Sequence, residues 1–158
     1  MSARATLHGA FTLERVYDAS PSRVFAAWAD IDAKARWFMG LADWCQLERA
    51  MDFRVGGRDR LRGRKGSGVV STFDSVYLDI VPDQRIIYSY DMRLDETHIS
   101  VSLATVELRP EGAGTRLTLT EHGVFLDGYD DAGSRERGTS ILLDQLGAAL
   151  QRADAGKR

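Results

Sequence analysis

The residue with the clearest chemical role is a glutamate near the end of the strand-rich part of the chain. Leu117, Leu119 and Glu121 stand two residues apart, so in a strand their side chains share one face. If the two leucines face the core, Glu121 does too, and burial then raises its pKa. An inward carboxyl is a candidate acid, base or ligand anchor. The alternative is that the strand bulges or ends by Gly123, which leaves Glu121 at a wet rim.

Two tyrosines form a second candidate group. Tyr88, Tyr90 and Met92 alternate with polar residues and share a face with Ile86. Phenols beside a thioether can fix the polar end of a ligand while presenting apolar area, but they are equally suited to an ordinary core. A tyrosine, serine or histidine within hydrogen-bond reach of Glu121 would favour acid–base chemistry, whereas an isolated Glu121 would favour simple binding.

The strand-like segment 97–109 leaves its inward face open. His98 and Ser100 share one face, and Ile99 and Val101 share the other. If the first pair points inward, it adds polar groups to the same site. If the second pair does, the histidine is exposed.

Neither a metal nor another cofactor is expected. His8, His98 and His122 lack the spacing of a metal motif, and His8 falls in an N-terminal tail. His122 directly follows Glu121, so the two side chains point to opposite faces of a strand and do not form a dyad. Cys45 is the only cysteine and has no partner for an internal disulfide.

Aromatic side chains complete the candidate site. Trp37 follows a short helical pattern and is either cavity wall or plain core. Phe125 opens the acidic loop 125–133, which is either a lid or a simple lead into a helix N-terminus. The expected ligand-binding residues are Trp37, Phe53, Tyr88, Tyr90, Met92, His98, Ser100, Glu121 and Phe125, and Glu121 is also the candidate catalytic residue.

The elements that position these residues follow from the hydrophobic period. Alternation predicts a first strand at 11–17, Ser20-Pro21 predicts the start of a short helix, and Asp30 caps a second. Further strands are expected at 44–54, 57–65, 68–80, 85–93, 97–109 and 115–124. From about Gly133 a 3.6-residue period predicts the longest helix. Short turns between the strands predict an antiparallel meander.

This order predicts an α+β fold in which a curved antiparallel sheet of six or seven strands wraps a long C-terminal helix, with two short helices after the first strand. The space between helix and sheet is a natural cavity. A single domain over residues 1–158 is expected, with an ordered core of about 10–153.

Composition narrows the class of protein. The 158 residues are 44% apolar and 28% charged with a net charge of −2, which is typical of a globular domain. Apolar runs are short and no signal segment is present, so a cytoplasmic protein without membrane insertion is expected. The arginines between Arg54 and Lys65 are interpreted as the solvated face of a sheet edge, without the aromatic residues typical of nucleic-acid binding.

Several segments between residue 11 and about residue 152 occur in an order and spacing shared with a known family. They are residues 15–21 and 24–28, Ala35-Arg36-Trp37-Phe38, Asp52-Phe53-Arg54-Val55-Gly56-Gly57, residues 79–86 and 114–120, and Leu142-Leu143-Asp144-Gln145-Leu146. The chain thereby resembles the SRPBCC or START-like superfamily, whose helix-grip fold is also that of the birch-pollen allergen. Within it, the chain resembles homologues of the activator of the heat-shock protein 90 ATPase. One difference is Gly138-Thr139, where the family often carries Gly-Trp.

The resemblance implies the fold, a cavity and a cytosolic location. For function it implies a range from binding a small hydrophobic or amphipathic molecule to polyketide cyclase, hydratase or hydrolase chemistry. Binding without catalysis is the main expectation. The alternatives are an enzyme that uses Glu121 as proton donor or acceptor with Tyr88 or Tyr90 polarising a carbonyl, and a chaperone-associated stress-response protein. An outer sheet face with Val101 and Leu103 would suit a homodimer.

Overall fold

The computed structural model describes residues 3–155, which form one seven-stranded antiparallel sheet and three helices. The strand order is β1-β7-β6-β5-β4-β3-β2. In chain order the elements are β1 (Thr6–Tyr17), α1 (Pro21–Ala29), α2 (Ile31–Ala35), β2 (Trp44–Met51), β3 (Arg58–Lys65), β4 (Val70–Val81), β5 (Arg85–Leu94), β6 (Thr97–Glu111), β7 (Gly114–Leu126) and α3 (Ala132–Ala155). Within these residues no helix is long and apolar enough to cross a bilayer.

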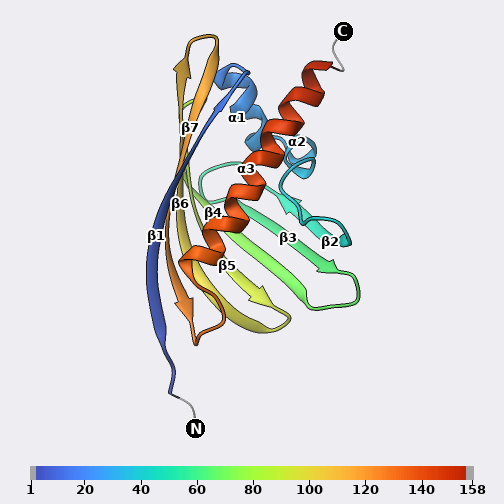
Figure 1. Cartoon of the computed structure of the whole chain (residues 1–158), viewed down its shortest axis with the longest axis vertical. Coiled ribbons are helices and arrows are strands. Elements are labelled where there is room, and N and C mark those ends of the chain that lie inside the picture. Colours follow the sequence, from blue (N-terminus) through green and yellow to red (C-terminus); the bar gives the residue numbers. More distant parts are fainter. Residues whose placement is uncertain (1–2, 156–158) are drawn as a thin grey trace.

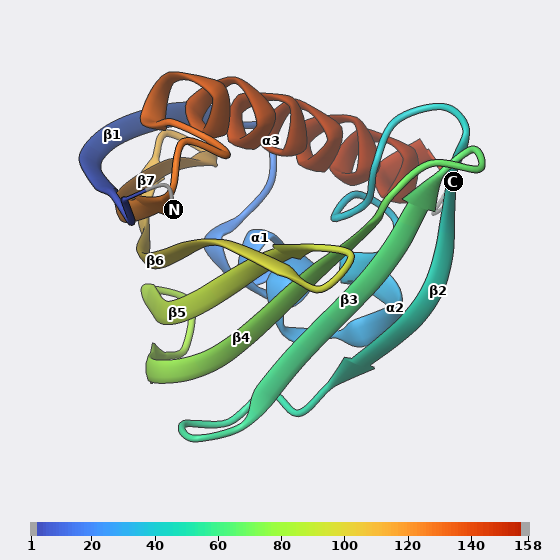
Figure 2. The ribbon, with the colours of Figure 1, turned by 90° about the horizontal axis from the view of Figure 1, so that it is seen from below.

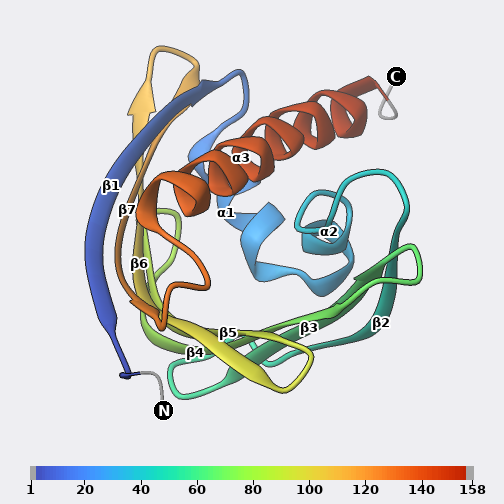
Figure 3. The same ribbon diagram turned by 60° about the horizontal axis from the view of Figure 1, so that its bottom comes forward.

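The sheet curves around α3, which lies diagonally across its concave face (Figure 1). Seen from below and tilted, α1 and α2 occupy the remaining space between α3 and strands β2 to β5 (Figures 2 and 3). The expected α+β helix-grip architecture, with two short helices after the first strand and a long C-terminal helix, is confirmed.

Short polar side chains begin the helices, as the sequence predicts for the first two. Ser20 Oγ accepts a hydrogen bond from the Arg23 N–H at 3.3 Å, and Asp30 Oδ1 accepts one from the Ala33 N–H at 2.9 Å. Asp131 Oδ1 likewise accepts from the Ser134 N–H at 2.8 Å. These bonds satisfy backbone donors that have no partner inside their helices, so each helix begins at a defined residue.

The N-terminal strand begins earlier than the sequence predicts. β1 starts at Thr6, and His8 pairs with Val124 of β7, so the expectation that His8 falls in a tail is wrong. Gly9 breaks the alternation that marks the strand in the sequence. A Cβ atom at Gly9 would lie 2.5 Å from the Ala132 Cβ, so the close approach of α3 to β1 requires glycine there. Tertiary packing therefore overrides the weak local strand signal.

The arginine-rich hairpin also lies differently from its prediction. β3 sits between β2 and β4, so only β2 of this hairpin is a sheet edge. Arg60 is exposed on β3 and pairs with Glu48 of β2 at 3.4 Å. The cationic residues of β3 therefore face solvent from within the sheet, partly neutralised by carboxylates of the neighbouring strands.

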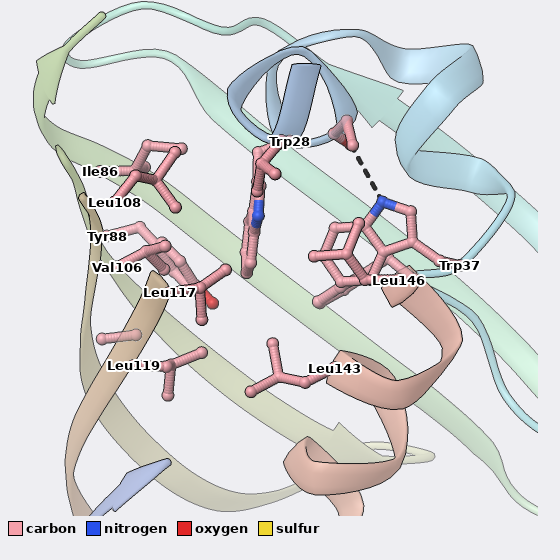
Figure 4. Packing of buried hydrophobic residues seen from close by; sticks show 14 of the residues in the cluster. Trp28, Trp37, Ile86, Tyr88, Val106, Leu108, Leu117, Leu119, Leu143 and Leu146 are labelled. Atoms are coloured by element: carbon pink, nitrogen blue, oxygen red, sulfur yellow. Dashed lines mark hydrogen bonds between the residues drawn. The ribbon is translucent and has the colours of Figure 1, made fainter. Parts of the chain in front are cut away.

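The core fills the space between the sheet and the helices (Figure 4). Trp28 and Trp37 pack edge to face with ring centroids 4.7 Å apart, and the Trp37 indole N–H donates to the Ala27 carbonyl at 3.0 Å. Leu143 and Leu146 of α3 close the cluster from the other side and are almost completely buried. These contacts fix the short helices and α3 relative to each other.

A buried ion pair joins α2 to the sheet. Lys34 and Asp59 are each only 2% exposed, and the Lys34 ammonium donates to Asp59 Oδ2. The Tyr77 hydroxyl donates to the same oxygen at 3.0 Å. The ammonium also lies 4.5 Å from the centroid of the Phe38 ring. Burial lowers the pKa of Lys34, and the nearby Asp59 carboxylate acts in the opposite direction.

Candidate functional site

A cavity of about 360 Å³ lies between the inner face of the sheet and α3. Most of its wall is apolar. The lining residues are Trp28, Trp37, Phe38, Met39, Gly40, Leu41, Trp44, Leu61, Ser71, Phe73, Tyr88, Tyr90, Met92, Leu119, Glu121, Arg135, Gly138, Thr139, Ile141, Leu142 and Leu143. A concave, mainly apolar site with a few polar groups is the usual form of a small-molecule site.

Glu121 points into this cavity because β7 keeps its two-residue period. Leu117, Leu119, Glu121 and Phe125 are all buried, and the β1–β7 and β6–β7 pairings run through this stretch without a bulge. Glu121 is 2% exposed. The alternative of a wet rim near Gly123 is therefore wrong, since the strand continues to Leu126.

A hydrogen-bond relay connects α3 to this carboxylate. Arg135 Nη1 donates to the Tyr90 hydroxyl at 2.9 Å, and that hydroxyl donates to Glu121 Oε2 at 2.8 Å. Arg135 Nη2 donates to Ser100 Oγ at 2.8 Å and to Asp130 Oδ2 at 3.0 Å. The polar end of the cavity is thus a connected group of side chains from β5, β6, β7 and α3.

Burial sets the protonation of this group. It raises the pKa of Glu121 to about 7, while the hydrogen bond from Tyr90 and the charge of Arg135 act in the opposite direction. Burial also raises the pKa of Tyr90, and the nearby Glu121 charge adds to that effect. Near neutral pH Glu121 can therefore exist in both its acid and its base form, with Tyr90 as a neutral phenol.

Arg135 is not among the residues predicted from the sequence, although a signal for it is present. Arg135, Thr139, Leu143 and Leu146 follow one another at steps of three or four residues, so they share one face of α3. The guanidinium lies 5.6 Å from the Tyr90 ring centroid and 5.3 Å from that of Phe125. A charged residue at the start of an apolar helical stripe is the feature that marks it.

Five of the expected site residues line the cavity together: Trp37, Tyr88, Tyr90, Met92 and Glu121. Ser100 also faces inward, but its hydroxyl is covered by Arg135, from which it accepts a hydrogen bond. Phe125 is 1% exposed and packs against the same guanidinium instead of forming a lid. Ser100 and Phe125 therefore hold the Arg135 side chain in place without lining the cavity themselves.

His98 and Phe53 do not line the cavity. A register shift in the β5–β6 pairing between Met92 and Arg93 separates His98 from the inward face of Ser100. His98 Nε2 instead lies 3.3 Å from Asp91 Oδ1. Phe53 packs against the rings of Phe25 and Tyr77, with centroids 5.7 Å and 4.9 Å away. The structure thus places neither side chain in the cavity wall, because the register shift turns His98 away and Phe53 lies beyond the end of β2 at Met51.

The cavity opens beside the segment that follows α2. Leu41 is 60% exposed and Ile141 40% exposed, although both contribute to the cavity wall. The Trp44 indole lies against Gly63, where an added Cβ would come within 2.1 Å of the ring. The absence of a side chain at Gly63 thus leaves room for the Trp44 ring in the wall. No sequence motif marks Gly63 or Trp44 as part of a site.

An antiparallel sheet curved around a long C-terminal helix, with two short helices after the first strand, defines the helix-grip, START-like class of proteins. The chain belongs to the family described as Activator of Hsp90 ATPase homolog 1-like protein, whose model matches residues 18–151. The search of curated proteins found no match.

Solved structures of similar proteins agree with this assignment. An uncharacterized protein from Rhizobium leguminosarum is 44% identical, with 96% of this chain and 99% of that chain covered and a TM-score of 0.91. A protein from Rhizobium loti is 47% identical over 92% of this chain and 99% of its own, with a TM-score of 0.85. A Chromobacterium violaceum protein is 28% identical over 89% and 96%, with a TM-score of 0.76.

Proposed function

We propose that this protein binds a small hydrophobic or amphipathic molecule in the cavity between the sheet and α3. The observation that carries the proposal is an apolar wall that ends in the Glu121–Tyr90–Arg135 relay. An apolar wall contributes affinity through burial, and a few fixed polar groups orient the ligand. Because Glu121 lines the cavity, its carboxyl is the natural anchor for the polar end of the ligand.

Obstructing the rim of the cavity tests this proposal. Gly138 is solvent-exposed but contributes to the wall, and an added Cβ there would have no atom within 4 Å. Gly138→Phe is therefore expected to leave the fold intact, helped by the removal of a helical glycine, while it weakens binding of the neutral dye Nile red by about tenfold or more. The measurement is a fluorescence titration, accompanied by native mass spectrometry of the protein purified from its own host.

Glu136→Phe is the matched control, because it places the same ring on an exposed position of α3 outside the cavity. It is expected to bind the dye as the unchanged protein does. Equal dye binding by both variants, or an unchanged protein that binds neither dye nor host molecule, would contradict the proposal. The next experiment would then be a pull-down that includes the chaperones of the host.

A second candidate is an enzyme of cyclase, hydratase or hydrolase type. The pairing of Glu121 with Tyr90 favours it, because a carboxyl that titrates near neutral pH can both donate and accept a proton. Tyr90 would orient the carboxyl, and Tyr88, which lines the same cavity, would polarise a carbonyl of the substrate. The test is incubation of the molecule extracted from the host protein with the unchanged protein and with Glu121→Gln. A mass change that only the unchanged protein produces would support chemistry, and an unaltered molecule in both would reject it.

A further inference from the structure

The charges at the polar end of the cavity do not suit an anionic ligand. Arg135 is the one cationic residue in the cavity wall of the described chain, and Asp130 lies 3.0 Å from its guanidinium. With Glu121 ionised, these three groups carry a net charge of −1, and with Glu121 protonated they carry none. A carboxylate or phosphate placed here would be repelled by Glu121 at low dielectric, without a free cation to offset it.

Two further cations that are buried or half-buried near the wall are already engaged. Lys34 is paired with the buried Asp59. Arg49 donates from Nη2 to the Phe38 carbonyl at 2.7 Å and from Nε to Gln46 Oε1 at 2.9 Å. Neither lies in the cavity wall. Inside the cavity formed by residues 3–155, an anionic head group would therefore find no unengaged cation to pair with.

Next to Arg135, the free atom of the relay is an acceptor, which favours a ligand that donates. The proton of the Tyr90 hydroxyl is used on Glu121 Oε2, and both terminal nitrogens of Arg135 donate to protein oxygens. Among the described residues nothing donates to Glu121 Oε1, which is an acceptor when ionised. The unpartnered Trp28 indole nitrogen is fully covered by neighbouring atoms.

Hydroxyls in the wall, those of Tyr88 and Thr139, can complement such a donor. Tyr88 lines the cavity, and its hydroxyl takes part in none of the hydrogen bonds within residues 3–155. Burial raises its pKa well above the ordinary value, with the Glu121 charge adding to the effect, so it stays a neutral phenol. A ligand hydroxyl can donate to Glu121 and accept from Tyr88, whereas a carboxylate can only accept.

The shape of the wall favours flat rings. Seven aromatic side chains line the cavity: Trp28, Trp37, Phe38, Trp44, Phe73, Tyr88 and Tyr90. Aromatic faces pack best against another ring, in stacked or edge-to-face contact. A volume of about 360 Å³ lies near the lower end of the range of about 300–1,000 Å³ for small-molecule sites. The occupant is therefore compact.

From these contacts we infer that the ligand is a compact, flat ring compound whose polar group is an uncharged hydrogen-bond donor, such as a phenolic hydroxyl, and that the site rejects carboxylates. This inference rests on the proposed binding function and specifies its ligand class. The groups that face Glu121 are Tyr88 and Tyr90 from β5 and Arg135 from α3, with Asp130 next to Arg135. Rejection of carboxylates is accordingly strongest when Glu121 is ionised and weakens as the pH falls through about 7.

Three matched probes test the inference by calorimetric titration at about pH 8, where phenols, with pKa values near 10, are still neutral. They are 2-naphthol, 2-naphthoate and the linear alcohol 1-decanol. The naphthol is expected to bind about tenfold or more tightly than either of the others. In Glu121→Gln the gap between naphthol and naphthoate is expected to shrink by about tenfold, because the amide keeps an acceptor but loses the charge. Glu136→Gln, which removes an exposed charge on α3, is expected to leave the gap unchanged.

The results of these titrations distinguish failure of the inferred ligand class from failure of the proposed binding function. If naphthoate binds as tightly as naphthol, or if Glu121→Gln leaves the gap intact, the charge selectivity is wrong. If decanol binds as tightly as naphthol, the preference for rings is wrong. In both cases the cavity still binds a ligand, so the proposed function survives. If none of the probes and no Nile red binds, the proposed function fails and the inference fails with it.

Discussion

Replacing Lys34 by methionine while Asp59 is kept is expected to lower the free energy of unfolding by about 3–5 kcal/mol. Both side chains are 2% exposed, so the substitution leaves a carboxylate buried without its cation. Tyr77 alone then remains as a hydrogen-bond donor to Asp59 Oδ2. The measurement is urea denaturation at neutral pH, followed by tryptophan fluorescence and circular dichroism.

The double variant Lys34→Met with Asp59→Leu distinguishes the cost of leaving one buried charge unpaired from the cost of altered packing. It removes both charges from an apolar site and is expected to recover most of the loss, because replacing a whole buried pair is often close to neutral. Arg85→Met breaks the exposed pair between Arg85 and Asp79 and serves as the control with little effect. A single variant as stable as the unchanged protein would show that the pair does not stabilise the fold. A double variant as unstable as the single one would assign the loss to packing.

The Lys34–Asp59 pair also bears on the candidate site. Lys34 is in α2, and Trp37 and Phe38, which follow directly after this helix, form part of the cavity wall. The Phe38 N–H donates to the Lys34 carbonyl at 2.8 Å. This backbone hydrogen bond holds Phe38 in a fixed position relative to Lys34. The pair therefore ties α2, and the rings that follow it, to β3.

Most of the fold could be predicted because it depends on local signals. The N-caps at Ser20 and Asp30 and the short turns between strands depend on residues close in sequence, and the structure has them where they are expected. The start of β1 could not be predicted, since Gly9 is there for its contact with Ala132, which is 123 residues away in the chain. A pattern confined to neighbouring residues cannot contain such a contact.

Residues of the candidate site could be predicted only where a strand keeps its two-residue alternation without interruption. Glu121 is found from the sequence because β7 alternates without a bulge from Leu117 onward. His98 is misplaced because the β5–β6 register shifts beside it, and no residue type in the sequence announces that shift. Arg135 and Lys34 are missed for a different reason. Long cations are usually solvent-exposed, and only the carboxylates and rings brought to them by tertiary packing make their burial favourable.

Glu121 is expected to make the stability of the protein depend on pH between about 4.5 and 7. Its pKa is about 7 in the folded protein against an ordinary value of 4.5, so the folded state binds the proton more tightly than the unfolded state. The stability contributed by the protonated carboxyl is fully present below about pH 4.5 and is lost as the pH rises through 7. With about 1.4 kcal/mol for each pH unit of the difference, the loss is about 3 kcal/mol.

The comparison with Glu121→Gln isolates this carboxyl from the other titrating groups. The amide keeps the shape of the side chain and cannot ionise, so the variant should become more stable than the unchanged protein by about 3 kcal/mol as the pH is raised from about 4.5 to 7.5. Urea denaturation at several pH values gives the two curves, and Glu136→Gln, on the exposed face of α3, should run parallel to the unchanged protein. If the Glu121→Gln curve is also parallel, Glu121 keeps an ordinary pKa in the folded state. Its role in proton transfer near neutral pH would then be excluded, while its role as a permanently ionised acceptor for a donating ligand would gain support.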